Sequence, residues 1–112
     1  MSQTDLPSPE EIQQLLRWRE PLSRPLGNDG VERFIGDLHR LHFMIDFDWP
    51  EWAARGQQIQ SDPVRLATAN LSTLCKLLTM DVRAERFHEG HIASCLKRGV
   101  FASILDRLQE IA

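Results

Sequence analysis

The sequence predicts an all-α protein, a compact single-domain bundle of five or six helices with a central helix at about residues 70–88. Two observations support this fold class. Apolar residues recur at helical spacing along most of the chain, and no segment shows a convincing strand alternation. Several expected helices also begin with a capping residue followed by proline and an acidic residue. We expect residues 1–8 to form a flexible N-terminus and residues 9–112 a single helical domain.

The first expected helix begins after Ser8, which is followed by a proline and by Glu11 in the pattern of a capping box. It ends at Pro21. Residues 21–30 contain two prolines and two glycines and are therefore expected to form a loop. A second amphipathic helix is expected at about residues 31–42, capped by Asn28 or Asp29.

Three further helix starts follow an aromatic-rich segment at residues 42–52. Asp48, followed by Trp-Pro-Glu, predicts a short helix over about residues 49–59. Asp62 and Pro63 predict another short helix, and Asn70 is expected to cap the longest one. Gly99 then precedes a final amphipathic helix at residues 100–111.

The central helix carries two apolar stripes and is therefore expected to be buried on two sides. Only Ser72, Lys76, Thr79 and Arg83 make a clear polar strip. The first stripe comprises Leu71, Leu74, Cys75, Leu78 and Val82, and the second comprises Leu77, Met80, Ala84 and Phe87. If the helix continues beyond this point, Glu85 and Glu89 extend the first stripe, where apolar residues are expected. A buried carboxylate requires a partner, so residues 83–91 are the main candidate site.

Composition and charge exclude several classes of protein. The chain has 112 residues, with 13 Lys and Arg against 16 Asp and Glu, so its net charge of −3 disfavours nucleic acid and anionic membranes as partners. The longest uncharged stretch, Leu66–Cys75, is too short to span a bilayer. The polar, acidic N-terminus does not resemble a secretory signal. We therefore expect a cytoplasmic protein without membrane or nucleic-acid contacts.

Two interpretations of function remain open. The first is a non-catalytic binding or regulatory module that contacts a protein partner or forms a homodimer. The alternative is a site for a small anion such as phosphate or carboxylate, with arginine as the main ligand and tryptophan as an aromatic wall. A pocket lined jointly by residues 85–91 and residues 49–52 would favour the ligand site. A fully paired salt bridge at residues 85–91 would favour the binding module. The candidate ligand-binding residues are Arg83, Glu85, Arg86, Glu89, His91, Trp49 and Trp52.

The sequence predicts no catalytic residue, no metal site and no cofactor. The four histidines form the pairs His39/His42 and His88/His91, whose spacing is compatible with metal ligation. Glu85 and His88 match half of a di-iron motif, but the chain has no second copy. The two cysteines, Cys75 and Cys95, follow the apolar pattern and are expected in the core.

The sequence also resembles a known family. The matching features are Phe-Asp-Trp-Pro-Glu-Trp at residues 47–52, Ser-Asp-Pro at 61–63, the leucine-rich block at 71–79, the segment at 82–91, and Gly99 followed by residues 104–108. Together they resemble domain-of-unknown-function family 6508, an uncharacterised prokaryotic all-helical family. This resemblance covers residues 31–111 and implies a small helical domain with no assigned activity.

The family resemblance also refines the alternative interpretation. Similar sequences joined to macro domains imply a nucleotide-like ligand such as ADP-ribose. The chain departs from the family pattern in two places. His88 stands where cysteine or a small residue is expected, and residues 21–30 are shorter than usual and lack the expected tyrosines and tryptophans. The second departure puts ligand binding by that loop in doubt.

Overall fold

All regular structure between residues 6 and 112, the part described by the computed structural model, is helical, so the all-α prediction is confirmed. Residues 1–5, part of the expected flexible N-terminus, lie outside the described residues. None of the helices in the described part has the length and apolar character needed to cross a membrane. The helices are α1 (Pro9–Leu16), η1 (Arg17–Arg19), η2 (Pro21–Ser23), α2 (Asn28–Arg40), α3 (Trp49–Ser61), α4 (Pro63–Leu66), α5 (Leu71–Ala84), α6 (His91–Lys97) and α7 (Val100–Ile111).

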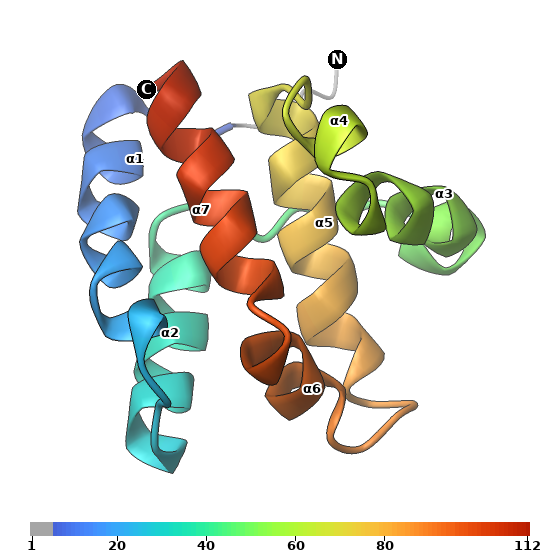
Figure 1. Cartoon of the computed structure of the whole chain (residues 1–112), viewed down its shortest axis with the longest axis horizontal. Coiled ribbons are helices and arrows are strands. Elements are labelled where there is room, and N and C mark those ends of the chain that lie inside the picture. The colour runs from blue at the N-terminus through green and yellow to red at the C-terminus, as the bar shows by residue number, and fades with distance from the viewer. Residues whose placement is uncertain (1–5) are drawn as a thin grey trace.

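Helix α5 is the centre of the bundle, as expected. In Figure 1 it lies between α7 on one side and α3 with α4 on the other, and it packs against α3, α6 and α7. Its two apolar stripes are fully buried over residues 74–80. The described residues form seven α-helices rather than five or six, because α6 is a separate helix of seven residues that was not predicted from the sequence, in addition to the predicted short helix α4.

Aromatic side chains join α2 and α7 to the segment that follows α1. Phe34 on α2 makes edge-to-face contacts with Trp18 and with Phe101 on α7, at ring-centroid distances of 5.4 and 5.3 Å. The indole Nε1 of Trp18 donates a hydrogen bond of 2.9 Å to Asp37. This arrangement satisfies the polar atom of a large side chain while its ring stays in the core.

Four of the expected helix caps are present. Ser8 and Glu11 form the predicted capping box, in which each side chain accepts a hydrogen bond from the other residue's backbone N–H. The side chains of Asp48, Asp62 and Asn70 accept hydrogen bonds from backbone N–H groups at the starts of α3, α4 and α5. These starts were predictable because each cap acts within four residues of its own position.

The boundaries of the first two helices differ from the prediction. Helix α1 ends at Leu16, and the chain continues as a 3-10 helix before Pro21. Helix α2 begins at Asn28 instead of Val31, with Gly27 at its N-cap and no side-chain cap. Asn28 and Asp29 are therefore part of the first turn. The helix ends at Arg40, and His42 follows in a left-handed conformation (φ 67°) that reverses the chain.

The connector between α2 and α3 is held against α5 by a buried hydroxyl group. Thr79 Oγ1 accepts a hydrogen bond of 3.0 Å from the backbone N–H of Ile45 and lies 3.5 Å from the carbonyl of Phe43. Thr79 was predicted on the polar strip of the central helix, but it is fully buried. The prediction was wrong because the backbone of another segment satisfies the hydroxyl, which removes the cost of burying it.

Candidate functional site

Helix α5 ends at Ala84, four residues earlier than predicted, and the chain turns through residues 85–90 into α6. The Glu85 carboxylate accepts hydrogen bonds of 2.8 Å from the backbone N–H groups of Gly90 and Ile92, at the start of α6. Gly90 is in a left-handed conformation (φ 91°), which brings these two N–H groups within reach. Glu85 therefore caps α6 instead of extending the apolar stripe of α5.

The other charged residues of this segment are not buried ion pairs. Arg86 and Glu89 are exposed and Arg83 is half-buried. Among residues 6–112, none of the three forms an ion pair or a side-chain hydrogen bond. In the part of the chain that the structure describes, these three residues therefore do not form a salt-bridge network, and Arg86 and Glu89 are exposed because they follow the end of α5 at Ala84.

The two predicted tryptophans have different surroundings. Trp49, at the start of α3, lies against Phe87 of the α5–α6 turn at a ring-centroid distance of 5.8 Å. Phe87 was predicted on the second apolar stripe, but it is 70% exposed. Trp52 packs instead against Phe47, and the Lys76 ammonium group lies 5.7 Å from both of their ring centroids.

A cavity of about 880 Å³ is lined in part by the predicted segment at residues 83–91. Glu85 and Gly90 line it together with residues of the 22–31 segment, α6 and α7, but Trp49 and Trp52 do not. The predicted aromatic wall and the predicted charged cluster therefore do not share this cavity.

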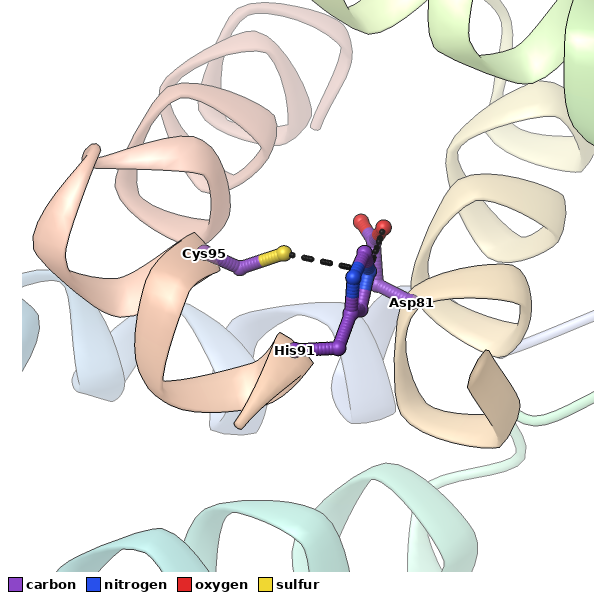
Figure 2. A group of neighbouring side chains, drawn as sticks. All are labelled: Asp81, His91 and Cys95. Atoms are coloured by element: carbon purple, nitrogen blue, oxygen red, sulfur yellow. Dashed lines mark hydrogen bonds and ion pairs between the residues drawn. The ribbon is translucent and has the colours of Figure 1, made fainter. Parts of the chain in front are cut away.

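His91 is the predicted residue with the most distinctive environment. Its Nε2 atom lies 3.1 Å from Asp81 Oδ1 and 3.4 Å from Cys95 Sγ. Figure 2 shows Asp81 projecting from α5 and Cys95 from α6, with the imidazole ring between them. Asp81 and Cys95 are fully buried. We call these three residues the Asp81 cluster.

Gln60 on α3 completes the surroundings of the Asp81 cluster. Its Nε2 atom donates a hydrogen bond of 3.2 Å to Asp81 Oδ1. Two buried oxygens have no hydrogen-bond partner within residues 6–112, namely Asp81 Oδ2 and Gln60 Oε1. The cluster is thus a buried polar site that the protein's own donors satisfy only in part.

Burial shifts the pKa values of Asp81 and Cys95. Desolvation raises the pKa of Asp81, and the hydrogen bonds from His91 and Gln60 oppose that shift. Desolvation also raises the pKa of the Cys95 thiol to about 12, helped by the nearby Asp81 charge. A thiol with this pKa is protonated at neutral pH and is a poor nucleophile.

The geometry of the cluster also differs from that of a catalytic triad. In a triad, the nucleophile and the carboxylate contact different nitrogens of the imidazole ring. Here Cys95 and Asp81 both contact Nε2. A single nitrogen does not accept a proton from the thiol while it donates one to the carboxylate, so proton relay through His91 is excluded in this arrangement.

Sequence reasoning did not single out Asp81 or its contact with His91 and Cys95. One signal was present, since Asp81 lies one turn after Leu77 and Leu78 and one turn before Ala84, on the apolar side of α5. A second signal was the spacing of His91 and Cys95, which places both on one face of a helix. Neither signal indicates that α6 packs against α5 at this point.

Comparison with family models places the chain in a family. The model described as Family of unknown function (DUF6508) matches residues 10–112. The chain belongs to this family. The DUF6508 match confirms the resemblance noted above and extends it from α1 to the C-terminus. No curated protein and no solved structure matches the chain, so the family assignment brings no molecular function with it.

The cap formed by Glu85 predicts an acid-sensitive contribution to the stability of this DUF6508 domain. Hydrogen bonds from the backbone N–H groups of Ile92 and Gly90 lower the pKa of Glu85 below its ordinary 4.5. Its stabilising effect is therefore complete above pH 4.5 and is lost as the pH falls through the lower, folded-state pKa. We expect Glu85→Ala to lower the Tm at pH 7 and to flatten the loss of Tm below pH 4.5.

Thermal unfolding followed by circular dichroism from pH 7 to pH 3 measures this effect. Glu32→Ala is the control, because Glu32 is an exposed glutamate on α2 whose side chain makes no hydrogen bond or ion pair within the described part of the chain. Identical pH profiles for Glu85→Ala and the wild type would show that the cap contributes nothing.

Proposed function

We propose that this DUF6508 domain is a non-catalytic binding module that associates with a second copy of itself. The proposed contact is the Phe87 surface, which comprises Trp49, Arg86, Phe87 and Glu89. The observation that carries the proposal is the 70% exposure of Phe87, whose ring lies against Trp49. Aromatic residues are enriched at protein interfaces, where they bury a large area at a low entropic cost.

The charges beside Phe87 support a second copy as the partner. A two-fold interface uses the same patch on both subunits, so the patch must be complementary to itself. Arg86 and Glu89 are exposed, carry opposite charges and have no ion-pair partner among the described residues. Across a two-fold axis, Arg86 of one subunit would meet Glu89 of the other, and the two aromatic pairs would pack between them.

Sedimentation velocity over a range of protein concentrations tests the proposal. We expect a concentration-dependent monomer–dimer equilibrium for the wild type. Phe87→Ser is expected to weaken dimerisation by roughly 30-fold, which corresponds to about 2 kcal/mol for an interface hot spot. Val64→Ser is the matched control, because Val64 is another exposed apolar residue (74%) and lies on α4, outside the Phe87 surface. A wild type that stays monomeric at millimolar concentration would contradict the proposal.

Charge reversal tests the predicted pairing. Arg86→Glu and Glu89→Arg should each weaken the dimer, because each places like charges opposite one another. The double variant Arg86→Glu/Glu89→Arg should recover most of the lost affinity, since it restores opposite charges. A double variant that dimerises no better than either single variant would rule out this pairing.

A specific observation also favours a second candidate function, the binding of a small anion. Arg83 and Arg86 lie three residues apart and have no ion-pair partner within residues 6–112. Such a pair suits a phosphate or carboxylate group, with Trp49 and Phe87 beside it. Two of the predicted ligand residues would not contact this anion, because His91 contacts Asp81 and the Glu85 carboxylate caps α6.

Thermal shift with phosphate, nucleotides and ADP-ribose tests the second candidate. A ligand at 100 times its Kd is expected to stabilise the domain by about 2.7 kcal/mol, which raises the Tm by several degrees. Arg83→Ala and Arg86→Ala should abolish the shift without changing the Tm of the free protein. No shift with any of these compounds would exclude them as ligands.

We also propose a cytoplasmic location. Its support is that Cys75 and Cys95 are both free thiols, as is usual where the compartment is reducing. Cell fractionation of the tagged full chain tests this proposal, and recovery in a secreted or membrane fraction would contradict it.

A further inference from the structure

We propose that Asp81, His91 and Cys95 form a binding site for a divalent transition-metal ion, with zinc as the expected ion. This inference is independent of the proposed dimer. The three side chains offer a carboxylate oxygen, an imidazole nitrogen and a sulfur, and these atoms all lie within 4.8 Å of one another. Zinc is bound by this combination of ligand types, and imidazole and thiolate disfavour calcium and magnesium.

Two of the three separations between the ligand atoms are close to those around a tetrahedral ion. Zinc lies about 2.0–2.2 Å from nitrogen or oxygen ligands and about 2.3 Å from sulfur, so two tetrahedral ligands are separated by roughly 3.4–3.6 Å. The observed separations are 3.1 Å from His91 Nε2 to Asp81 Oδ1 and 3.4 Å from His91 Nε2 to Cys95 Sγ. The third pair, the Asp81 oxygen and Cys95 Sγ, lies within 4.8 Å, so binding an ion requires the side chains to move until all three separations match this range.

The unpartnered oxygens are a second, independent observation that points to a ligand. Asp81 is fully buried, yet its Oδ2 atom has no hydrogen-bond partner in the described chain, and neither has Gln60 Oε1. Buried oxygens without donors are uncommon in native proteins. A metal ion directly compensates the Asp81 charge, and water in its fourth coordination position would supply the kind of donor that these oxygens lack.

Electrostatics also favours an ion at this place. One thiolate, one carboxylate and one neutral imidazole carry a charge of −2, which Zn²⁺ neutralises, so the occupied site has no net charge in the core. Binding would displace the proton of the Cys95 thiol.

The surroundings of the ligands are suited to a structural site. Gln60 Nε2 donates to Asp81 Oδ1 and so orients the carboxylate from a third helix, as outer-shell residues do in metal sites. The ligands come from α5 and α6. An ion held by both helices would therefore fasten the turn at residues 85–90 to the bundle.

Cobalt spectroscopy on the full chain tests the site. The protein is treated with a chelator and a reductant and is then titrated with Co²⁺, whose complex with a thiolate gives a near-ultraviolet charge-transfer band. We expect the band to saturate at one ion per chain, to disappear when Zn²⁺ is added, and to be accompanied by a rise in Tm of several degrees. Absence of the band in the folded wild type would overturn the proposal.

The two buried cysteines provide matched variants. Cys95→Ala should lose the band and weaken Zn²⁺ binding by more than the roughly 10–100-fold caused by loss of an outer-shell partner. Cys75→Ala should retain the band, because Cys75 is equally buried but is not part of the Asp81 cluster. The reverse result for the two cysteines would overturn the assignment.

A third variant covers the case in which Cys95→Ala fails to fold. His91 has a side chain that is 15% exposed, so His91→Gln is the ligand substitution that the fold should tolerate best. We expect this variant to keep the far-ultraviolet circular dichroism of the wild type and to lose tight Zn²⁺ binding in a competition titration with a chromophoric chelator. A folded His91→Gln protein with unchanged Zn²⁺ affinity would contradict the proposed ligand set.

Discussion

Phe34→Ala is expected to lower the free energy of unfolding by about 3–5 kcal/mol, the range for truncation of a buried aromatic side chain. Phe34 is 1% exposed and makes edge-to-face contacts with Trp18 and Phe101. Its removal leaves a cavity between α2 and α7 that the surrounding helices fill only in part. Such a loss is a large share of the 5–15 kcal/mol that is typical of whole domains. Urea denaturation of the purified protein measures it through the midpoint and the slope.

Phe87→Ala is the matched control for this prediction. The residue type is the same, but Phe87 is 70% exposed and its main aromatic contact is with Trp49. We expect the stability of the Phe87→Ala monomer, measured at a protein concentration too low for dimerisation, to remain within about 0.5 kcal/mol of the wild type, as for most surface substitutions. Equal losses at Phe34 and Phe87 would mean that the Phe87 ring is part of the core.

Gly56→Ala is expected to lower the free energy of unfolding by about 1–2 kcal/mol, although alanine is the better helix former by about 1 kcal/mol. A Cβ atom at residue 56 would lie 2.7 Å from Met80 Sδ and 2.7 Å from Trp52 Cζ3. Met80 is almost fully buried and its sulfur has little room to move, whereas Trp52 is half-buried. The free-energy cost of overpacking against Met80 on α5 is therefore expected to exceed the gain in helix propensity.

Gly36→Ala separates these two effects. Gly36 lies within α2, and a Cβ atom there would have no atom within 4 Å outside its own helical turn. We expect this variant to be more stable than the wild type by up to about 1 kcal/mol. Thermal unfolding of both variants measures the contrast, and a stabilising Gly56→Ala would show that α3 and α5 are not packed this tightly.

The helix starts were predictable from the sequence because the interactions that make them are local. Ser8, Asp48 and Asn70 each accept a hydrogen bond from a backbone N–H three residues ahead, and no distant part of the chain is needed. The apolar stripes of α5 were predictable for the same reason, since helical periodicity shows which faces a helix will bury.

The end of α5 was not predictable from periodicity. The helical spacing of apolar residues continues in the sequence to Phe87, but the helix ends at Ala84 and Phe87 is exposed. The reason is that the Glu85 carboxylate accepts hydrogen bonds from the backbone N–H groups of Gly90 and Ile92. These bonds stabilise a loop at residues 85–90 instead of a further turn of α5. This contact depends on the position of α6, which periodicity does not describe.

The amino-acid pattern was sufficient to predict a bundle of helices, the starts of most of those helices and the leucines of the core. The burial of Asp81 beside His91 and Cys95, and the exposure of Arg86 and Phe87, depend on how the helices pack against one another. This is because helical periodicity indicates which face of a helix is buried, but it does not indicate which other helix covers that face. Residues 81 and 91 belong to different helices, and their side chains meet because α6 packs against α5.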